Sequence, residues 1–412
     1  MGQISMTAGQ ARGKQFIDPV FSVASAAKEA AARYGPEGII NASIGTIYDD
    51  EGQLATFSAV NDLIKEIPAW RMMDYAPIKG IPGFAEAAME FTFGRARPEA
   101  YLAAIATPGG TGAIRHVFYN YAEEGSRILI PDWYWGAYAV IAGEFGRHVE
   151  TFSLFTGENT FNLASFQEKV QELLQEQENL VIVLNSPAHN PTGFSLSLRE
   201  WQAVLSFLRE VARNKTKKIT LLVDIAYMDY AGEAEEVRAF FRLFGGLPEN
   251  IVVTVAFSMS KTFLAYGLRC GALIAISSNR RVVEEFLEVN SYSNRANWSN
   301  VTRLPQELLV EIVGNPDLLT RIREERDFYR QLLAGRANIF VREAKEEQLE
   351  MCPYFAGFFI SLPVAEAKSA ASRLQQERVF AVPMKKGLRL AICSIPARKI
   401  AGLAAKIKSV LS

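Results

Sequence analysis

The middle of this chain alternates short apolar runs with stretches of helical periodicity. Runs rich in Val, Ile and Leu that end in turn or polar residues are typical of buried strands. Such runs occupy RILIPD (127–132), VIVLNSP (181–187), ITLLVDIAY (219–227), IVVTVAFS (251–258) and GALIAIS (271–277). Helical spacing is found between them, at 163–178 and at 198–213, and Asn162 or Ser165 is the expected cap of the first helix. This order predicts right-handed crossovers and an α/β fold with a mostly parallel, doubly wound sheet.

The C-terminal part has a different pattern. Residues 316–347 are dense in charge and helix formers, which predicts a long exposed helix. A strand-like run at 357–363, an amphipathic stretch at 365–377 and a second run at 388–395 then indicate a smaller α+β domain. The first 50 residues are expected to pack against that domain or to form an arm. The predicted division is an N-terminal arm with part of the small domain at 1–60, a large domain at 61–310 and a C-terminal small domain at 311–412.

Composition excludes several classes of function. The 44 Lys and Arg residues balance 45 Asp and Glu, so the net charge of -1 gives no electrostatic footprint for nucleic acid or an anionic membrane. No apolar run approaches the ~18 residues of a membrane span, and the N-terminus lacks the apolar region of a secretory signal. Three cysteines and three scattered histidines show no disulfide framework and no metal spacing. We therefore expect a cytoplasmic protein without a bound metal.

Chemically useful side chains follow the predicted strands. In a doubly wound sheet, ligands bind at the carboxyl ends of the strands. One strand ends in Asp224, with Tyr227 three residues later, and another ends in Ser258-Met259-Ser260-Lys261. A third ends in the loop AHNPTG (188–193). A glycine-rich stretch that begins at Gly109 looks like a loop opening a helix, where free N–H groups bind phosphate.

Pyridoxal phosphate is a cofactor that uses all of these groups. It needs a lysine for its Schiff base, and an acidic partner for the pyridine nitrogen that makes the ring an electron sink. It also needs a phosphate cradle and a residue that holds the ring oxygen. In isolation, a lysine after a strand is usually a solvated surface residue and Asp224 reads as a turn residue or a cap. Their occurrence together with Tyr227 and Arg269 favours the cofactor site.

The whole pattern resembles the fold type I pyridoxal-phosphate aminotransferases, close to the aspartate aminotransferase family. Seven segments occur in the family's order across most of the chain. They are DYAPIKG (74–80), GGTGAIR (109–115), AHNPTG (188–193), DIAY (224–227), SMSKTFLAYGLRCG (258–271), RANWSN (295–300) and GLRLAIC (387–393). The chain departs from the family at Gly109, where serine is commoner, and at Ala137, where the family often has an asparagine on the ring oxygen.

The resemblance implies a role for each matching residue in cofactor binding. Lys261 carries the cofactor, Asp224 binds the pyridine nitrogen and Tyr227 the ring oxygen. The remaining cofactor-binding residues are Gly110, Thr111, Asn190, Ser258 and Arg269, with Tyr75 reaching in from a partner subunit. Trp135 is the expected ring-stacking residue, with Trp133 as the alternative, and His189 is expected to support the cofactor rather than to act as a base.

The resemblance also implies the substrates. Gly45, Asn190 and Arg389 are expected to bind the substrate, and Arg389 and Asn190 to hold the α-carboxylate of an amino acid or a 2-oxo acid. Arg295 of the partner subunit is expected to hold a distal carboxylate, which favours aspartate or glutamate with 2-oxoglutarate. Trp298 replaces the tyrosine common in that motif and keeps an aromatic substrate range open.

Other interpretations of the sequence stay open. A carbon–sulfur lyase or a decarboxylase of the same fold would share the cofactor residues and differ in which bond at Cα is broken. A regulatory module without turnover is a third possibility, although the chain lacks the length and basic patch of an added DNA-binding domain. The expected assembly is a homodimer with shared active sites and ping-pong kinetics.

Overall fold

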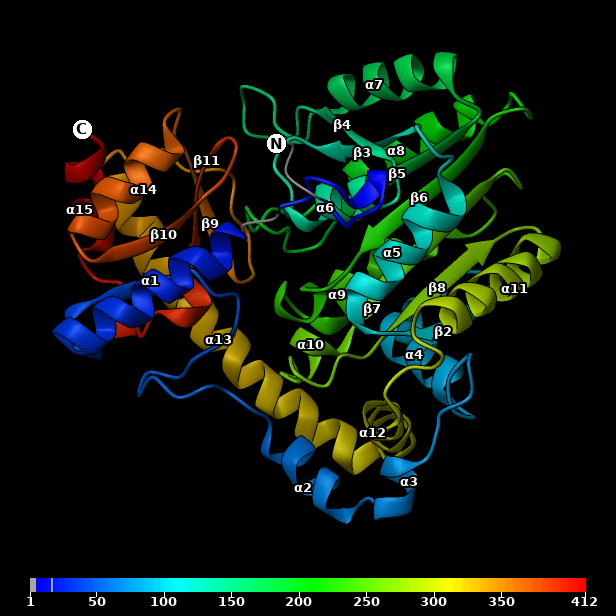
Figure 1. The fold of residues 1–412 in the computed structure, drawn as a ribbon, viewed down its shortest axis with the longest axis horizontal. Coiled ribbons are helices and arrows are strands. Elements are labelled where there is room, and N and C mark those ends of the chain that lie inside the picture. Colours follow the sequence, from blue (N-terminus) through cyan, green and yellow to red (C-terminus); the bar gives the residue numbers. More distant parts are fainter. Residues whose placement is uncertain (1–4, 16–17) are drawn as a thin grey trace.

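A seven-stranded sheet forms the centre of the larger body of the protein (Figure 1). The computed structural model describes residues 5–15 and 18–412, so parts of the predicted arm at 1–60 lie outside the described residues. The strand order is β2-β8-β7-β6-β5-β3-β4. β8 alone runs against its neighbours β7 and β2, which confirms the predicted mostly parallel sheet. The strands are β2 (Tyr101–Thr107), β3 (Arg127–Pro131), β4 (His148–Phe152), β5 (Asn179–Asn185), β6 (Lys218–Asp224), β7 (Ile251–Ser258) and β8 (Gly271–Ser277).

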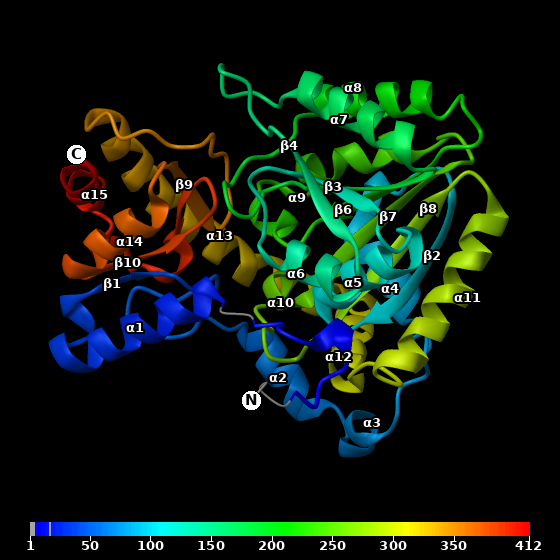
Figure 2. The same ribbon diagram turned by 45° about the horizontal axis from the view of Figure 1, so that its top comes forward.

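Helices cover both faces of this sheet (Figure 2). One face packs against α5 (Gly109–Tyr121), α6 (Ala137–Glu144) and α11 (Arg280–Asn297). The other packs against α4 (Phe84–Phe93), α7 (Leu163–Glu176) and α8 (Leu198–Val211). The side chain of Asn162 accepts the Ser165 N–H at 3.0 Å, so Asn162 is the cap of α7. A capping box between Ser197 and Glu200 fixes the start of α8.

A smaller four-stranded sheet forms the second body, as predicted. Its order is β1 (Ile40–Ala42), β10 (Val379–Pro383), β11 (Gly387–Ala391) and β9 (Phe359–Pro363). β1 pairs with β10 in parallel, and the other pairs are antiparallel. Three helices belong to this body: α1 (Pro19–Tyr34), α14 (Ala367–Gln376) and α15 (Leu403–Leu411). Val23 and Ala27 of α1 share a core cluster with Phe380 of β10, so the N-terminal region contributes to the small body.

The long helix α13 (Pro316–Glu346) joins the two bodies. Ile322 and Leu333 lie in the core of the large body, whereas Ala337 and Phe340 lie in the core of the small one. The change between the two cores therefore falls inside α13, whereas the sequence predicts a boundary at residue 310. The remaining α-helices are α2 (Ser58–Glu66), α3 (Ala69–Met73), α9 (Ala234–Arg238), α10 (Met259–Thr262) and α12 (Arg303–Gly314). Within the described residues, no helix combines the length and apolar character that a membrane crossing requires.

Candidate active site

A cavity of about 150 Å³ opens at the carboxyl edge of the large sheet. Strand ends and the loops that follow them supply Asn185, Asn190, Asp224, Ala226, Tyr227, Ser258, Ser260, Lys261 and Arg269 to its lining. Gly110 and Thr111, at the start of α5, and Trp135 also line it. A larger cavity of about 490 Å³ lies at the opposite edge, where β5, β6 and β7 begin. We place the candidate site in the smaller cavity, because ligands of such sheets bind at the carboxyl ends of strands.

Asp224 lies at the end of β6, next to Asn185 in the register of β5 and β6. Its carboxylate accepts the Tyr138 hydroxyl at 2.6 Å on Oδ2 and the Ala226 N–H at 3.1 Å on Oδ1. Burial raises the pKa of Asp224, and the Tyr138 hydrogen bond, the Ala226 N–H and the charge of Lys261 oppose this rise. The side-chain amide of Asn185 donates to the Asp224 carbonyl oxygen at 2.7 Å, which fixes the backbone beneath the carboxylate.

Lys261 lies in α10, a single turn that directly follows β7. Ser258 caps this turn by accepting the Ser260 N–H, and Tyr230 donates its hydroxyl to the Lys261 carbonyl oxygen at 3.1 Å. Burial lowers the pKa of Lys261 to about 8, although the Asp224 carboxylate opposes the shift. The Lys261 Nζ lies 5.4 Å from the centre of the Tyr227 ring. An amine of this kind is partly neutral near pH 8 and can act as a nucleophile or a base.

The start of α5 forms an anion cradle with Arg269. Gly109 has a φ of +69°, and a Cβ there would lie 2.7 Å from the Arg269 Nη2. A Cβ at Gly110 would lie 3.4 Å from the Cβ of Ser258, so the helix N-terminus lies against the end of β7. Arg269 donates from Nη1 to the Ser260 hydroxyl at 2.9 Å. Free N–H groups, a guanidinium and hydroxyls converge here, which is the donor set that binds a phosphate.

Tyr227, Asn190 and Arg389 form a connected group across the two bodies. The Asn190 amide donates to the Tyr227 hydroxyl at 3.3 Å. Arg389 of β11 donates from Nη1 to Asn190 Oδ1 at 3.5 Å and from Nη2 to the Ser43 carbonyl oxygen at 2.7 Å. Burial lowers the pKa of Arg389 and raises that of Tyr227. A buried guanidinium beside an amide is suited to bind a carboxylate.

Arg389 retains unused hydrogen-bonding capacity. Its Nε is buried and has no hydrogen-bond partner among the described residues. The guanidinium lies 4.4 Å from the centre of the Phe359 ring. Gly45 lies against the same ring, since a Cβ there would be 2.6 Å from a Phe359 carbon. Gly45 is thus close to Arg389, and a side chain there would displace the ring beneath the guanidinium; its predicted role in substrate binding stays a prediction.

The two tryptophans of the 131–138 segment occupy different places. Trp135 lines the cavity, whereas Trp133 is 5% exposed and packs where the small body begins, near Gly387. His189 is buried and bonds to the Thr192 hydroxyl at 2.8 Å, and burial lowers its pKa to about 3. The position of Trp135 agrees with its predicted ring-stacking role, which stays a prediction.

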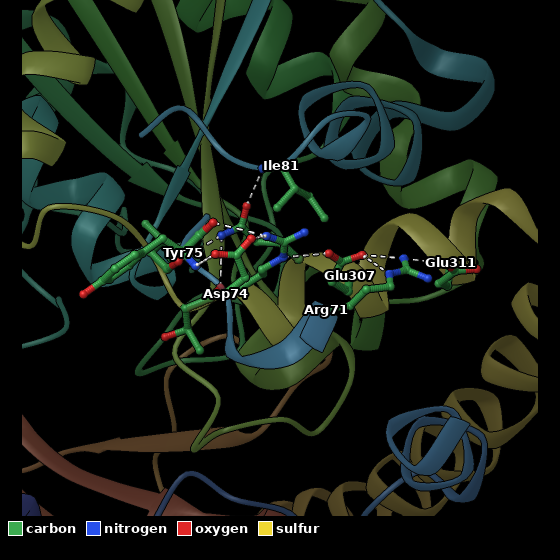
Figure 3. A network of polar contacts seen from close by, with 10 residues as sticks. Arg71, Asp74, Tyr75, Ile81, Glu307 and Glu311 are labelled. Atoms are coloured by element: carbon green, nitrogen blue, oxygen red, sulfur yellow. Dashed lines mark hydrogen bonds and ion pairs between the residues drawn. The ribbon is translucent and has the colours of Figure 1, made fainter. Parts of the chain in front are cut away.

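Tyr75 and Arg295 do not line the cavity of their own chain. Tyr75 follows α3 and is 82% exposed. Arg303 donates to the Tyr75 carbonyl oxygen at 3.2 Å and so holds the backbone of Tyr75. Figure 3 shows the Tyr75 side chain extending away from the ion pairs that Arg71 makes with Glu307 and Glu311. Arg295 is exposed near the end of α11 and donates to the Ser299 hydroxyl at 2.6 Å. The indole of Trp298 stacks on His116 at 4.8 Å, so it packs against α5.

Sequence reasoning missed three residues of this site. Asn185 carried a usable signal, because it is a polar residue at the end of a buried strand. Ser260 lies inside the recognised Ser-x-Ser-Lys segment but received no role. Tyr138 lies three residues after Trp135, at the end of the tryptophan segment 131–138, but received no role; its contact with Asp224 depends on how α6 packs on the sheet.

Residues 37–407 match the family described as aminotransferase class I and II. The chain belongs to this family. It is 26% identical over 316 residues to the aspartate aminotransferase of Escherichia coli (strain K12), a match that covers 75% of this chain and 77% of the other. It is 29% identical over 258 residues to an aromatic-amino-acid aminotransferase of Pseudomonas aeruginosa, covering 61% of this chain and 62% of that protein.

Solved structures agree with this assignment. The crystal structure of an aminotransferase from Anaerococcus prevotii has a TM-score of 0.97 at 40% identity and covers 99% of this chain and 100% of its own. An aromatic-amino-acid aminotransferase from Burkholderia pseudomallei, covalently bound to pyridoxal phosphate, has a TM-score of 0.77 at 22% identity, covering 99% and 100%; this likeness concerns the fold. The class I and II aminotransferase described here is thus a transaminase that uses pyridoxal phosphate.

The donor set of the cavity fits this cofactor. Gly109 and Gly110 lack the side chains that would meet Arg269 and Ser258, so the guanidinium and the end of β7 approach the start of α5 closely, where a phosphate would bind. Asp224 can accept a hydrogen bond from a ring nitrogen, and Lys261 supplies an amine within the same cavity. The cavity therefore supplies an amine, an acidic partner for the ring nitrogen and a phosphate-binding site, which are the main groups that pyridoxal phosphate requires.

Proposed function

We propose that Lys261, Asp224 and Tyr227 carry the transamination chemistry of this enzyme. When bound, pyridoxal phosphate supplies the electron sink for a bond broken at the substrate Cα. Gly110, Thr111, Ser258 and Arg269 would hold its phosphate, Trp135 would pack on its ring and Asp224 would face its ring nitrogen. The observation that carries this proposal is the lining of one cavity by Lys261, Asp224 and the start of α5.

The proton-transfer role falls to Lys261. Because burial lowers its pKa to about 8, a useful share of the amine is neutral near neutral pH and can take a proton from the substrate Cα. General acid–base transfer of this kind contributes about 10²–10⁴-fold in rate. The Tyr227 hydroxyl, held by Asn190 at 3.3 Å, stays protonated because burial raises its pKa, and it can donate to an oxygen of the ring.

Arg389 and Asn190 are proposed to bind the substrate α-carboxylate. The two side chains are already within 3.5 Å, and Arg389 Nε is buried with no partner among the described residues. A carboxylate would satisfy the guanidinium and hold the Cα substituents in one orientation. Gly45 is proposed to border the same substrate site, where its lack of a side chain leaves room for the Phe359 ring below Arg389.

The proposed substrates are aspartate and glutamate, with 2-oxoglutarate as the amino acceptor. Arg295 is the proposed partner of the distal carboxylate, and its exposure at the end of α11 leaves it free to enter a neighbour's site. Relatives of this chain include aspartate and aromatic-amino-acid aminotransferases, so they support both substrate classes. An aromatic preference is the second candidate.

The substitution Arg295→Leu tests the substrate class. We expect kcat/KM for aspartate and glutamate to fall about 10- to 100-fold, because a charged hydrogen bond to the distal carboxylate is lost. The values for phenylalanine and tyrosine should change little. Arg281→Leu, an exposed arginine on the same helix, is the matched control and should leave all values unchanged. An unchanged aspartate value in Arg295→Leu would refute the dicarboxylate assignment without affecting the transaminase assignment.

The proposed assembly is a homodimer in which Tyr75 and Arg295 complete the partner's site. Trp70, Met73 and Tyr75 are 67%, 82% and 82% exposed, a concentration of apolar surface around α3 that favours an interface. Arg71 and Arg303 hold this segment against Glu307, so it is presented in a fixed form (Figure 3). A cytoplasmic location stays a prediction of the sequence.

A further inference from the structure

Tyr138 makes an unusual contact for a core tyrosine. It lies in the first turn of α6, its side chain is fully buried, and its hydroxyl donates to Asp224 Oδ2 at 2.6 Å. A hydroxyl–carboxylate bond of this length lies in the range of strong, charge-assisted hydrogen bonds. The second donor to this carboxylate in the described part of the chain is the Ala226 N–H at 3.1 Å. Tyr138 is therefore the side-chain group that most directly stabilises the ionised form of Asp224.

Packing holds the Tyr138 ring in one place. The Tyr138 N–H donates to the Trp135 carbonyl oxygen at 3.0 Å. The Trp135 ring meets the Tyr138 ring edge-on, with centroids 5.6 Å apart, and Phe118 of α5 lies 6.3 Å away on another side. The same residue thus contacts the aromatic wall of the cavity and the carboxylate at its base.

The Tyr138 hydroxyl is a permanent hydrogen-bond donor to Asp224. Burial and the neighbouring Asp224 charge raise the pKa of Tyr138 well above its usual range, so the phenol stays protonated in the working pH range. Burial pushes the pKa of Asp224 in the same upward direction, which favours a neutral carboxyl. A hydrogen bond donated to the charged form counteracts that tendency.

We propose that Tyr138 is a positioning residue that keeps Asp224 ionised and oriented for the ring nitrogen of the cofactor. It acts through Asp224 and needs no contact with the cofactor. A neutral Asp224 could not pair with a protonated ring nitrogen, and the cofactor would then bind more weakly and withdraw electrons less well. This inference rests on the proposed role of Asp224, and it assigns a function to a residue that had no predicted role.

The substitution Tyr138→Phe removes the donor and keeps the ring packing. In the cofactor-free protein we expect the pKa of Asp224, followed by carboxyl-carbon NMR with Asp224→Asn for assignment, to rise by about one to two units. Between the Asp224 pKa of wild type and the higher Asp224 pKa of Tyr138→Phe, the variant's affinity for pyridoxal phosphate should be about tenfold lower than that of wild type. Above the pKa of the variant, its Asp224 carboxyl ionises again and the loss of affinity should shrink. Tyr119→Phe, an exposed tyrosine on the neighbouring α5, is the matched control and should leave both quantities unchanged.

A second variant covers the case in which Tyr138→Phe unfolds. Incorporation of 3-fluorotyrosine at position 138 makes the hydroxyl a stronger donor with almost the same shape, so the pKa of Asp224 should move down. A role in packing alone predicts no shift in either variant. The inference is overturned if Asp224 titrates as in wild type in both proteins, or if the affinity loss of Tyr138→Phe is the same at every pH. Failure of wild-type protein to bind the cofactor would instead refute the assignment of the cavity.

Discussion

At the scale of single residues, Lys261 shows how burial creates reactivity. The lysine lies beside Asp224, whose charge favours the protonated amine, yet burial outweighs this charge and the pKa falls to about 8. Desolvation is therefore the larger of the two effects. The amine is consequently available near neutral pH, as a group that binds a cofactor and moves a proton must be.

The reactivity of Lys261 should follow this pKa in the cofactor-free enzyme. The rate at which a trace acylating reagent labels Lys261, followed by peptide mass spectrometry, should rise with a midpoint near pH 8. An unperturbed lysine has a pKa of about 10.4. In Asp224→Asn the midpoint should move lower still, because the carboxylate that favours the charged amine is gone. A midpoint near 10 in wild type would contradict the burial argument.

The residues at the strand ends were predictable, whereas the contact of Tyr138 with one of them was not. Asp224 and Lys261 follow apolar runs directly, and a parallel sheet brings such positions to one edge. Tyr138 contacts Asp224 across 86 positions of sequence, through the packing of α6 on the sheet. A contact of that kind is set by tertiary packing, which a local pattern does not carry.

At the scale of elements, the start of α5 depends on the backbone of Gly109. Its φ of +69° lies in the region that side chains disfavour, and Arg269 occupies the space where a Cβ would be. The helix N-terminus and the guanidinium thus meet directly. Glycine is therefore favoured at position 109 of this chain, where the family more commonly has serine.

Gly109→Ala should therefore damage both stability and cofactor binding. We expect a loss of about 1 kcal/mol in unfolding free energy from the positive φ, together with an affinity for pyridoxal phosphate about tenfold lower, equivalent to ~1.4 kcal/mol, because Arg269 is displaced. Gly125→Ala is the matched control, since Gly125 has a φ of +79° and open space around it. It should lose similar stability in thermal unfolding and keep wild-type affinity in a cofactor titration. Equal affinity in both variants would contradict the cradle.

Among the elements themselves, strong apolar runs were easier to predict than weak ones. The runs at 251–258 and 271–277 match β7 and β8 at both ends. In the large sheet, the sequence pattern did not reveal β2 and β4. β2 reads YLAAIAT, and alanine has little preference for strands. β4 is a partly exposed edge strand with polar residues, so its apolar signal is diluted.

At the scale of the whole molecule, the two bodies meet across the site. Asn190 belongs to the large body and Arg389 to the small one, and they lie 3.5 Å apart. Lys386 also pairs with Asp132 across the same boundary. The sequence predicted two domains from the change in pattern. It could not predict that α13 enters both cores, because one amphipathic helix gives the same signal whether it packs on one core or two.

The predicted dimer adds a third contribution, which subunit mixing can test. Each variant by itself, Lys261→Ala or Arg295→Ala, should have only weak activity toward aspartate. If the sites are shared, a mixed dimer contains one site with neither substitution, and full exchange of equal amounts should restore about one quarter of wild-type activity. No recovery, with exchange shown by a mass-tagged subunit, would mean that each site is built from one chain.

Every role proposed for this site depends on Lys261 being the residue that bonds to the cofactor. The direct measurement is borohydride reduction of the enzyme loaded with pyridoxal phosphate, followed by peptide mass spectrometry. We expect the cofactor to be fixed on the peptide containing Lys261, and Lys261→Ala to carry none. Cofactor fixed on another lysine, or wild-type protein that retains none after reduction, would contradict the role of Lys261.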